Sequence, residues 1–87
     1  MSVATIEALI ALAPAAPTLR VSVQRFLGLV LTAGGNYPYT HLEHVDHDAQ
    51  RSRVLIRVRG PRIELDRLTY TLKATFRLEV AELEMGR

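Results

Sequence analysis

The chain has 87 residues with no cysteine and no tryptophan, and its only aromatic residues are three tyrosines and two phenylalanines. Without cysteine there can be no disulfide framework and no thiolate metal site, so packing must hold the fold together. Long apolar runs are also lacking. The longest stretch without Asp, Glu, Lys or Arg is residues 26–42, and its glycines, asparagine and proline do not suit a bilayer core. We therefore expect a single small domain, residues 1–87, with no segment that crosses a membrane.

The first sixteen residues are apolar enough to resemble the centre of an export signal. However, no Lys or Arg precedes them and Glu7 lies among them, which does not fit a signal peptide. We expect this segment to form a strand of a cytoplasmic protein. Disorder is excluded as well, because apolar residues make up 48% of the chain and the net charge is only +2.

Two segments alternate with the period of two that is typical of strands with one buried side. In residues 3–12 one face carries four apolar side chains: Ile6, Ala8, Ile10 and Leu12. In residues 51–59 one face carries Ser52, Val54, Ile56 and Val58, and the other carries Leu55 and four arginines. Two further strands are predicted at residues 40–45, followed by a turn at 46–48, and at residues 76–83, with a shift of phase expected near 81–83.

Two segments carry apolar residues at helical spacing. The first follows Pro14 and Pro17, runs from Thr18 to a stop at Gly34-Gly35, and has one apolar face made of Leu19, Val23, Phe26, Leu27 and Val30. The second opens at Gly60-Pro61, with Pro61 at its first helical position. Its apolar stripe consists of Leu65, Leu68 and Leu72, flanked by Ile63 and Thr69.

The predicted order is therefore β-α-β-β-α-β, which has one well-known compact solution, the ferredoxin-like α+β sandwich. Right-handed crossovers place both helices on the same face of a four-stranded antiparallel sheet with strand order 4-1-3-2. The strand at residues 51–59 then lies inside the sheet. Its apolar face meets the helices and its arginine face points outward.

Three histidines, His41, His44 and His47, lie close together in the chain. On a strand, His41 and His47 share one side and His44 points to the other, so the three do not converge as zinc ligands must. The Gly34-Gly35 pair follows a helix and has no Lys-Ser/Thr partner, so it is explained as a helix stop and not as a phosphate loop. No nucleophile–base arrangement is visible. We expect neither a metal site nor catalysis by this chain.

The outward arginines have two interpretations. Five of them fall in one run with no acid among them: Arg51, Arg53, Arg57, Arg59 and Arg62. They could pair with acids of neighbouring strands, such as Glu7 and Glu79. Alternatively they could bind RNA, since RNA-recognition modules share this fold. Those modules stack bases on aromatic side chains of the central strands, and the predicted outward positions here hold no aromatic residue, so we expect no nucleic-acid partner.

A family resemblance rests mainly on the second half of the chain. The segments Asp48-Ala49-Gln50, Val58-Arg59-Gly60-Pro61-Arg62 and Leu72-Lys73 are similar to the short small subunits of acetohydroxyacid (acetolactate) synthase. Residues 76–83, Phe-Arg-Leu-Glu-Val-Ala-Glu-Leu, look like the terminal strand of that family's ACT domain. The element order, the proline-containing loop before the first helix and the glycine end of that helix also resemble ACT domains. The resemblance covers about residues 3–84.

The resemblance implies a non-catalytic regulatory subunit in branched-chain amino-acid biosynthesis. Thiamine diphosphate, Mg and FAD are expected on the large catalytic subunit, and no cofactor is expected on this chain. In the family, the small subunit raises the activity of the large subunit and often confers feedback inhibition by valine or another branched-chain amino acid. Such regulation couples a binding pocket to a contact surface elsewhere.

ACT domains usually hold an amino acid between the start of the first helix and the adjoining subunit. The resemblance therefore implies effector-binding residues at the helix start and, in the partner domain, at the glycine turn: Pro17, Thr18, Leu19, Gly34, Gly35 and Asn36. The valine-responsive members have an Asn in the first loop and a Gly just before the helix, where this sequence has Pro14 and Pro17. Proline offers no N–H group, so we expect a stimulating subunit with weak or absent valine response.

Partners follow from the same resemblance. We expect a homodimer formed through the edge strand at residues 40–45 and a complex with the large subunit, for which Arg53, Arg57 and Arg59 are docking candidates. Two alternatives stay open. One is a stand-alone ACT-type dimer that senses another amino acid for another enzyme. The other is an RNA-binding module of the same fold.

Overall fold

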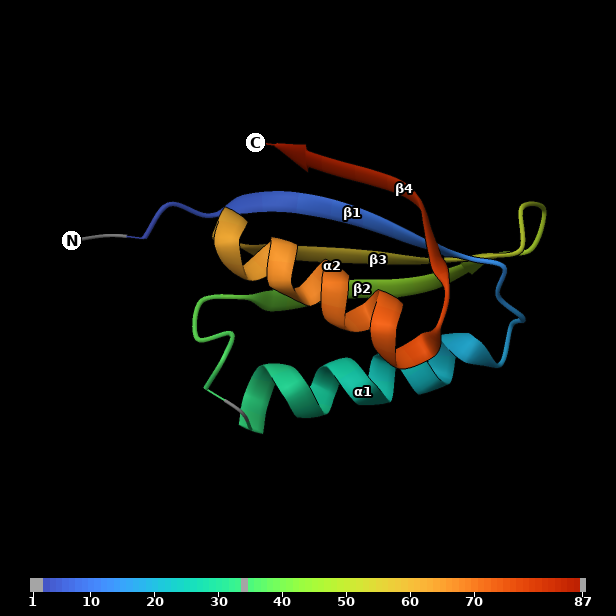
Figure 1. Cartoon of the computed structure of the whole chain (residues 1–87), viewed down its shortest axis with the longest axis horizontal. Helices are drawn as coiled ribbons and strands as arrows, with labels where there is room; N and C mark the ends of the chain where they lie inside the picture. The colour runs from blue at the N-terminus through green and yellow to red at the C-terminus, as the bar shows by residue number, and fades with distance from the viewer. Residues whose placement is uncertain (1–2, 34, 87) are drawn as a thin grey trace.

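The computed structural model of the protein describes residues 3–33 and 35–86 and has the predicted order of strands and helices (Figure 1). The elements are β1 (Ile6–Ala13), α1 (Leu19–Ala33), β2 (His41–Asp48), β3 (Arg53–Gly60), α2 (Arg62–Phe76) and β4 (Glu79–Gly86). Within the described ranges no helix is both long and apolar enough to cross a membrane.

The four strands form one antiparallel sheet in the order β2-β3-β1-β4, as predicted. In the central pair, Ile10 of β1 lies opposite Ile56 of β3, and Leu12 lies opposite Val54. The register of β1 with β4 shifts between Ala11 and Leu12, which leaves Ala81 of β4 unpaired in this ladder. The predicted change of phase near residues 81–83 is thereby confirmed.

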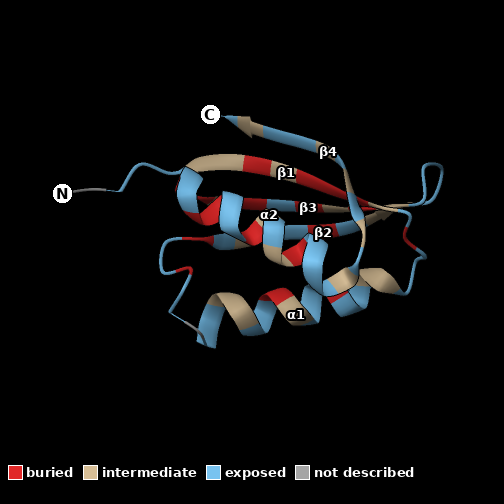
Figure 2. Cartoon of the chain, in the orientation of Figure 1, coloured by how far each residue is buried: buried red, intermediate tan, exposed pale blue. Residues whose placement is uncertain are grey.

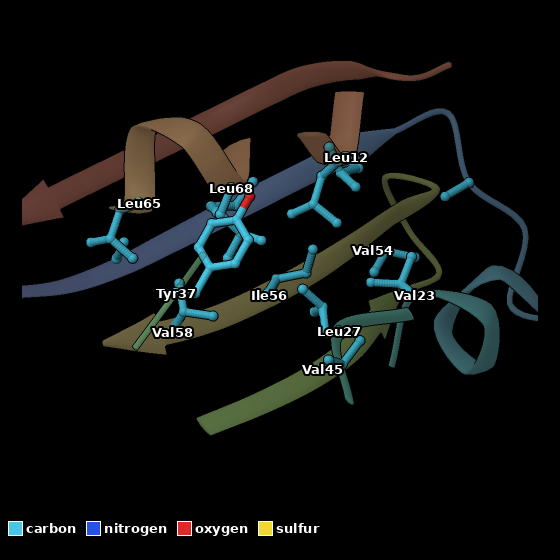
Figure 3. Packing of buried hydrophobic residues seen from close by; sticks show 14 residues of the cluster. Leu12, Val23, Leu27, Tyr37, Val45, Val54, Ile56, Val58, Leu65 and Leu68 are labelled. Carbon is cyan, nitrogen blue, oxygen red and sulfur yellow. The ribbon is translucent and has the colours of Figure 1, made fainter. Parts of the chain in front are cut away.

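A single apolar core lies between the sheet and the two helices (Figures 2 and 3). The alternation of β1 and β3 supplies its sheet side, and the repeats of α1 and α2 supply the other. Ten of its side chains are the largest fully buried ones: Ile10, Leu12, Val23, Leu27, Val54, Ile56, Val58, Leu65, Leu68 and Leu72. At the C-terminal end of α2, Phe76 packs edge-to-face on Phe26 of α1, with ring centroids 5.5 Å apart. Both helices therefore cover one face of the sheet.

All four strand predictions differ from the structure at their ends, since residues 3–5 and 76–78 are not strand. The ends of β2 and β3 that meet at their turn are also different. The predicted turn at residues 46–48 is strand, because Asp46 and Asp48 continue the β2 ladder opposite Leu55 and Arg53. The turn instead occupies residues 49–52, and Ser52 lies in it with φ 51° and not on the buried face of β3. Aspartate favours turns in isolation, but here the pairing with β3 outweighs that local preference.

The second helix also differs from its prediction. Pro61 is the N-cap residue, with extended backbone, and the helix begins one residue later. The helix includes Phe76, which was predicted as strand, and ends at Arg77 in a left-handed conformation with φ 54°. Ile63 was predicted to flank the buried stripe, yet it is 68% exposed. The end of the helix was misplaced because Arg77 gives no glycine-like stop signal in the sequence.

Candidate functional site

The outward face of the sheet holds the three arginines that were predicted to dock a partner. Arg57 and Arg59 project from β3 beside Glu7 of β1, at nitrogen–oxygen distances of 3.6 and 3.8 Å. Arg59 also lies 3.6 Å from Glu43 of β2. The predicted pairing of the arginines with Glu7 is therefore confirmed. Glu79, the other predicted partner, instead lies 3.9 Å from Lys73 of α2.

Arg53 is the most buried of these arginines, with a side chain only 12% exposed. It lies between Asp48 at 3.3 Å and Glu82 at 3.7 Å, and its buried Nε has no hydrogen-bond partner among the described residues. Partial burial raises the pKa of Asp48. Hydrogen bonds from the Arg53 side chain and from the backbone N–H groups of Arg51 and Gln50, together with the Arg53 charge, outweigh this effect and hold the pKa below its ordinary value.

The outward face is acidic as a whole and not basic. Three arginines project from β3, and six carboxylates surround them on the other strands: Glu7, Glu43, Asp46, Asp48, Glu82 and Glu84. The five aromatic residues all lie on the helices or in the loop before β2. Base stacking and phosphate attraction, the two requirements of RNA binding on such a sheet, are therefore missing from the described part of this face. A docking role of Arg53, Arg57 and Arg59 stays a prediction, and docking there would have to displace their ion pairs.

The histidines are arranged differently from the prediction. A register shift between Leu42 and His44 brings His41 and His44 to the same outward side, opposite Arg59 and Arg57, while His47 faces the helix side opposite Val54. The predicted pairing of His41 with His47 on one side was therefore wrong, because the alternation was counted without the irregularity at Glu43. Nε2 of His47 lies 2.8 Å from the carbonyl oxygen of Ala15. Among the described residues no group of three or more His, Asp or Glu side chains could hold a metal ion.

The predicted effector residues lie at the two ends of α1. At its start, the N–H groups of Leu19 and Arg20 donate to the carbonyl oxygens of Ala16 and Pro17, at 3.0 and 3.2 Å. These donors are already used within the chain, and Pro17 has none. The start of α1 therefore offers few free N–H groups to a carboxylate.

The other end of α1 lies about 22 Å away, given its 15 residues and a rise of about 1.5 Å per residue. Gly34 lies outside the described residues, and Gly35 has a left-handed φ of 69°. The carbonyl oxygen of Asn36 accepts a hydrogen bond from Nη1 of Arg67 at 2.9 Å. The two predicted segments are thus not brought together within one chain. Only a second chain could join them, as the resemblance implies.

A groove of about 360 Å³ lies beside Asn36, between the C-terminal part of α1 and α2. Its lining consists of Leu29, Val30, Ala33, Asn36, Tyr37 and Thr71. The hydroxyl groups of Tyr37 and Thr71 lie 3.1 Å apart and join the loop to α2. No sequence pattern predicts this groove, since Tyr37 and Thr71 are 34 positions apart and belong to no common repeat.

Glu64 fixes the same loop at the start of α2. Its side chain is buried, and Oε1 accepts hydrogen bonds from the backbone N–H of Tyr39 at 3.1 Å and from the hydroxyl of Thr40 at 2.8 Å. Gly60 makes room for this contact, because a Cβ there would collide with the Thr40 hydroxyl and lie 3.1 Å from the Thr40 Cα. The loop between α1 and β2 is therefore held in place at Tyr37, Tyr39 and Thr40.

Comparisons with known protein families, with curated proteins and with solved structures find no match to this chain.

Proposed function

We propose that this chain is the non-catalytic small subunit of an acetohydroxyacid synthase and that it stimulates a separate large subunit. The observation that carries the proposal is the fold: a β-α-β-β-α-β chain with sheet order β2-β3-β1-β4 and both helices on one face. This is the architecture expected from the sequence resemblance around residues 58–62 and 76–83. The fold alone serves many functions, so the assignment to this family depends on that resemblance.

The response to valine is proposed to be weak or absent. An effector carboxylate is best held by free N–H groups at a helix start. In this chain Pro17 has no such group, and the N–H groups of Leu19 and Arg20 already bond to Ala16 and Pro17. Stimulation of the large subunit would then be the main role of the chain, and its branched-chain amino-acid effector would bind poorly.

A homodimer is part of the proposal. The outer edges of β2 and β4 are open in the single chain, and open edges favour sheet extension by a second copy. Along β2, three acidic residues and a register irregularity near Glu43 disfavour continuous pairing with a second copy. Light scattering at high micromolar concentration is expected to give the mass of a dimer, and a monomer would contradict this part of the proposal.

The test is a reconstitution with the acetohydroxyacid synthase large subunit from the same source, loaded with thiamine diphosphate, Mg²⁺ and FAD. We expect the purified chain to raise the rate of acetolactate formation from pyruvate at saturating cofactor. Valine at millimolar concentration is expected to leave the stimulated rate nearly unchanged. Bovine albumin at equal mass is the control for non-specific stabilisation of the enzyme.

An amino-acid sensor for another enzyme is the second candidate. The groove beside Asn36 favours it, because its apolar walls can hold an apolar amino-acid side chain and its polar lining groups can bond to the polar end of the ligand. Calorimetric titration distinguishes the two: tight stoichiometric binding of an amino acid, without stimulation of the large subunit, would replace the first proposal with this one.

A further inference from the structure

The helices expose large apolar side chains on the side that faces away from the sheet. On α1, Val21 and Leu29 are 49% and 63% exposed, and on α2, Ile63 and Tyr70 are 68% and 74% exposed. These positions lie on the opposite side of each helix from its fully buried residues, such as Val23 and Leu65. Figure 2 shows this exposed side of α2 facing the viewer. Exposed apolar side chains that gather on one layer often mark an interaction site.

An arginine lies between the two apolar side chains on each helix. The spacing is Val21, Arg25 and Leu29 on α1, and Ile63, Arg67 and Tyr70 on α2, so each triplet forms one stripe along its helix. We call these six residues together the outer helix surface. Neither Arg25 nor Arg67 forms an ion pair with a carboxylate in residues 3–33 or 35–86. Nη1 of Arg67 donates a hydrogen bond to the carbonyl oxygen of Asn36, but this neutral acceptor does not cancel the charge of the guanidinium group.

The helices carry few negative charges that could neutralise these arginines. α1 contains no acidic residue. α2 contains two, of which Glu64 is buried under the loop and Asp66 lies 3.6 Å from Arg62. The outer helix surface is therefore positive and apolar, whereas the outward face of the sheet is acidic and its arginines are paired. Opposite faces of this small domain thus differ in charge.

The two helices also leave a groove in this layer. Figure 1 shows α1 and α2 diverging toward the end of the molecule where the loop before β2 lies. The groove beside Asn36 lies there, and Leu29 of the outer helix surface forms part of its wall. A protruding side chain of a partner could enter it, and this favours a protein over the smooth surface of a lipid bilayer.

We infer that the outer helix surface is the site at which this chain docks onto a partner protein whose own surface presents carboxylates around apolar side chains. The inference rests on the proposed function, under which that partner is the synthase large subunit. Charge complementarity carries it: Arg25 and Arg67 attract carboxylates, and the four apolar residues supply the desolvated contact. Docking here leaves the ion pairs of Arg53, Arg57 and Arg59 intact, unlike docking on the sheet.

A second copy of the chain is a less suitable partner. Its acidic sheet face would also complement the outer helix surface, but that contact joins two different faces. A contact between different faces is heterologous and does not close unless the copies form a ring, so it would produce open-ended assemblies. Docking onto the large subunit joins two different proteins, so it can form a closed complex without a ring.

The test measures binding of the chain to the isolated large subunit by calorimetry, and the stimulated rate beside it. Two double variants alter the outer helix surface: Arg25→Glu with Arg67→Glu, and Ile63→Ser with Tyr70→Ser. The sheet control makes the same change of charge at two of the arginines that were predicted to dock a partner, Arg57→Glu with Arg59→Glu, and so tests that competing surface directly. Circular dichroism and thermal unfolding check that each variant is folded.

We expect each helix variant to weaken binding by about tenfold or more, which corresponds to about 1.4 kcal/mol, because each variant alters two contacts at the centre of the proposed interface. The charge variant should also reduce the salt dependence of binding. A folded sheet control should keep its affinity for the large subunit within about threefold. This change is smaller than the loss of affinity expected from removing one central contact. If the control unfolds, the milder pair Arg57→Gln and Arg59→Gln takes its place.

The outcomes separate this inference from the proposed function. If the wild-type chain neither binds nor stimulates the large subunit, the proposed function fails and the docking assignment fails with it. If the wild type binds and both folded helix variants bind equally well, the docking surface alone is wrong. Loss of binding only in the sheet control would show that the interface lies at the arginines of β3 and that the inference is wrong. Tight binding to phosphatidylserine vesicles, or growth of the free chain into large assemblies, would overturn the inference in favour of a membrane or a second copy.

Discussion

At the scale of single residues, charges on the sheet are arranged in pairs and not as a basic patch. Arg53 illustrates this, because its side chain lies between Asp48 and Glu82 and is mostly covered. The alternation of residues 51–59 correctly predicted that the arginines share one face. It could not show that carboxylates of the other three strands surround them, since cross-strand neighbours depend on the pairing register.

Asp48 gives this pairing a dependence on pH. Its pKa is lowered in the folded chain, so its contribution to stability is fully present above the pKa of the unfolded chain and is lost as pH falls through the lower, folded value. We expect Asp48→Asn to reduce the free energy of unfolding at pH 7, and the difference from wild type to shrink as the pH falls below about 4, the ordinary range of an aspartate pKa. Urea unfolding at several pH values measures both effects.

The control for this prediction is the same substitution in an Arg53→Gln chain. Arg53 is the side-chain donor that lowers the Asp48 pKa, so without it the pH dependence of Asp48→Asn should be smaller. A difference between wild type and Asp48→Asn that stays constant from pH 7 to pH 2 would contradict the assignment.

At the scale of elements, the loop before β2 is fixed to α2 by side chains. Glu64 accepts hydrogen bonds from Tyr39 and Thr40, and Tyr37 contacts Thr71. This arrangement places the wall of the groove and sets the start of β2. We expect Glu64→Leu to leave the Tyr39 N–H and the Thr40 hydroxyl without their acceptor, at a cost of about 1–3 kcal/mol for each group that stays buried.

Glu64→Gln is the matched variant, because its amide keeps one oxygen that can accept both hydrogen bonds. Chemical unfolding should therefore rank the variants with Glu64→Gln near wild type and Glu64→Leu clearly less stable. Equal stability of wild type and Glu64→Leu would show that the buried carboxylate does not hold the loop.

Elements with a strong repeat were predicted well, and elements whose ends depend on distant contacts were not. The apolar face of residues 3–12 and the leucine stripe of α2 follow the periods of strand and helix, so the buried sides of β1 and α2 were predicted correctly. The length of β2 was not predictable, because Asp46 and Asp48 belong to the strand only through their pairing with β3. The groove was missed for a similar reason, since its walls come from α1, the loop and α2.

At the scale of the whole molecule, one thin core carries the stability and the exposed side of the helices is left for another role. Leu27 and Leu29 show the contrast on a single helix, because Leu27 is fully buried and Leu29 is 63% exposed. Leu27→Ala should lower the free energy of unfolding by about 2–5 kcal/mol, a large share of the about 5–15 kcal/mol that such domains possess. Leu29→Ala makes the same chemical change and should alter stability by no more than about 0.5 kcal/mol.

The same two substitutions, Leu27→Ala and Leu29→Ala, test whether the exposed Leu29 contributes to binding of the large subunit. If the outer helix surface docks the large subunit, Leu29→Ala should weaken that binding although its unfolding curve matches that of wild type. Calorimetry with the large subunit and urea unfolding of the free chain supply the two numbers for each variant. A loss of stability in Leu29→Ala as large as that in Leu27→Ala would mean that Leu29 contributes to the packing of the core. The apolar side chains on the outside of the helices would then need no partner to explain them.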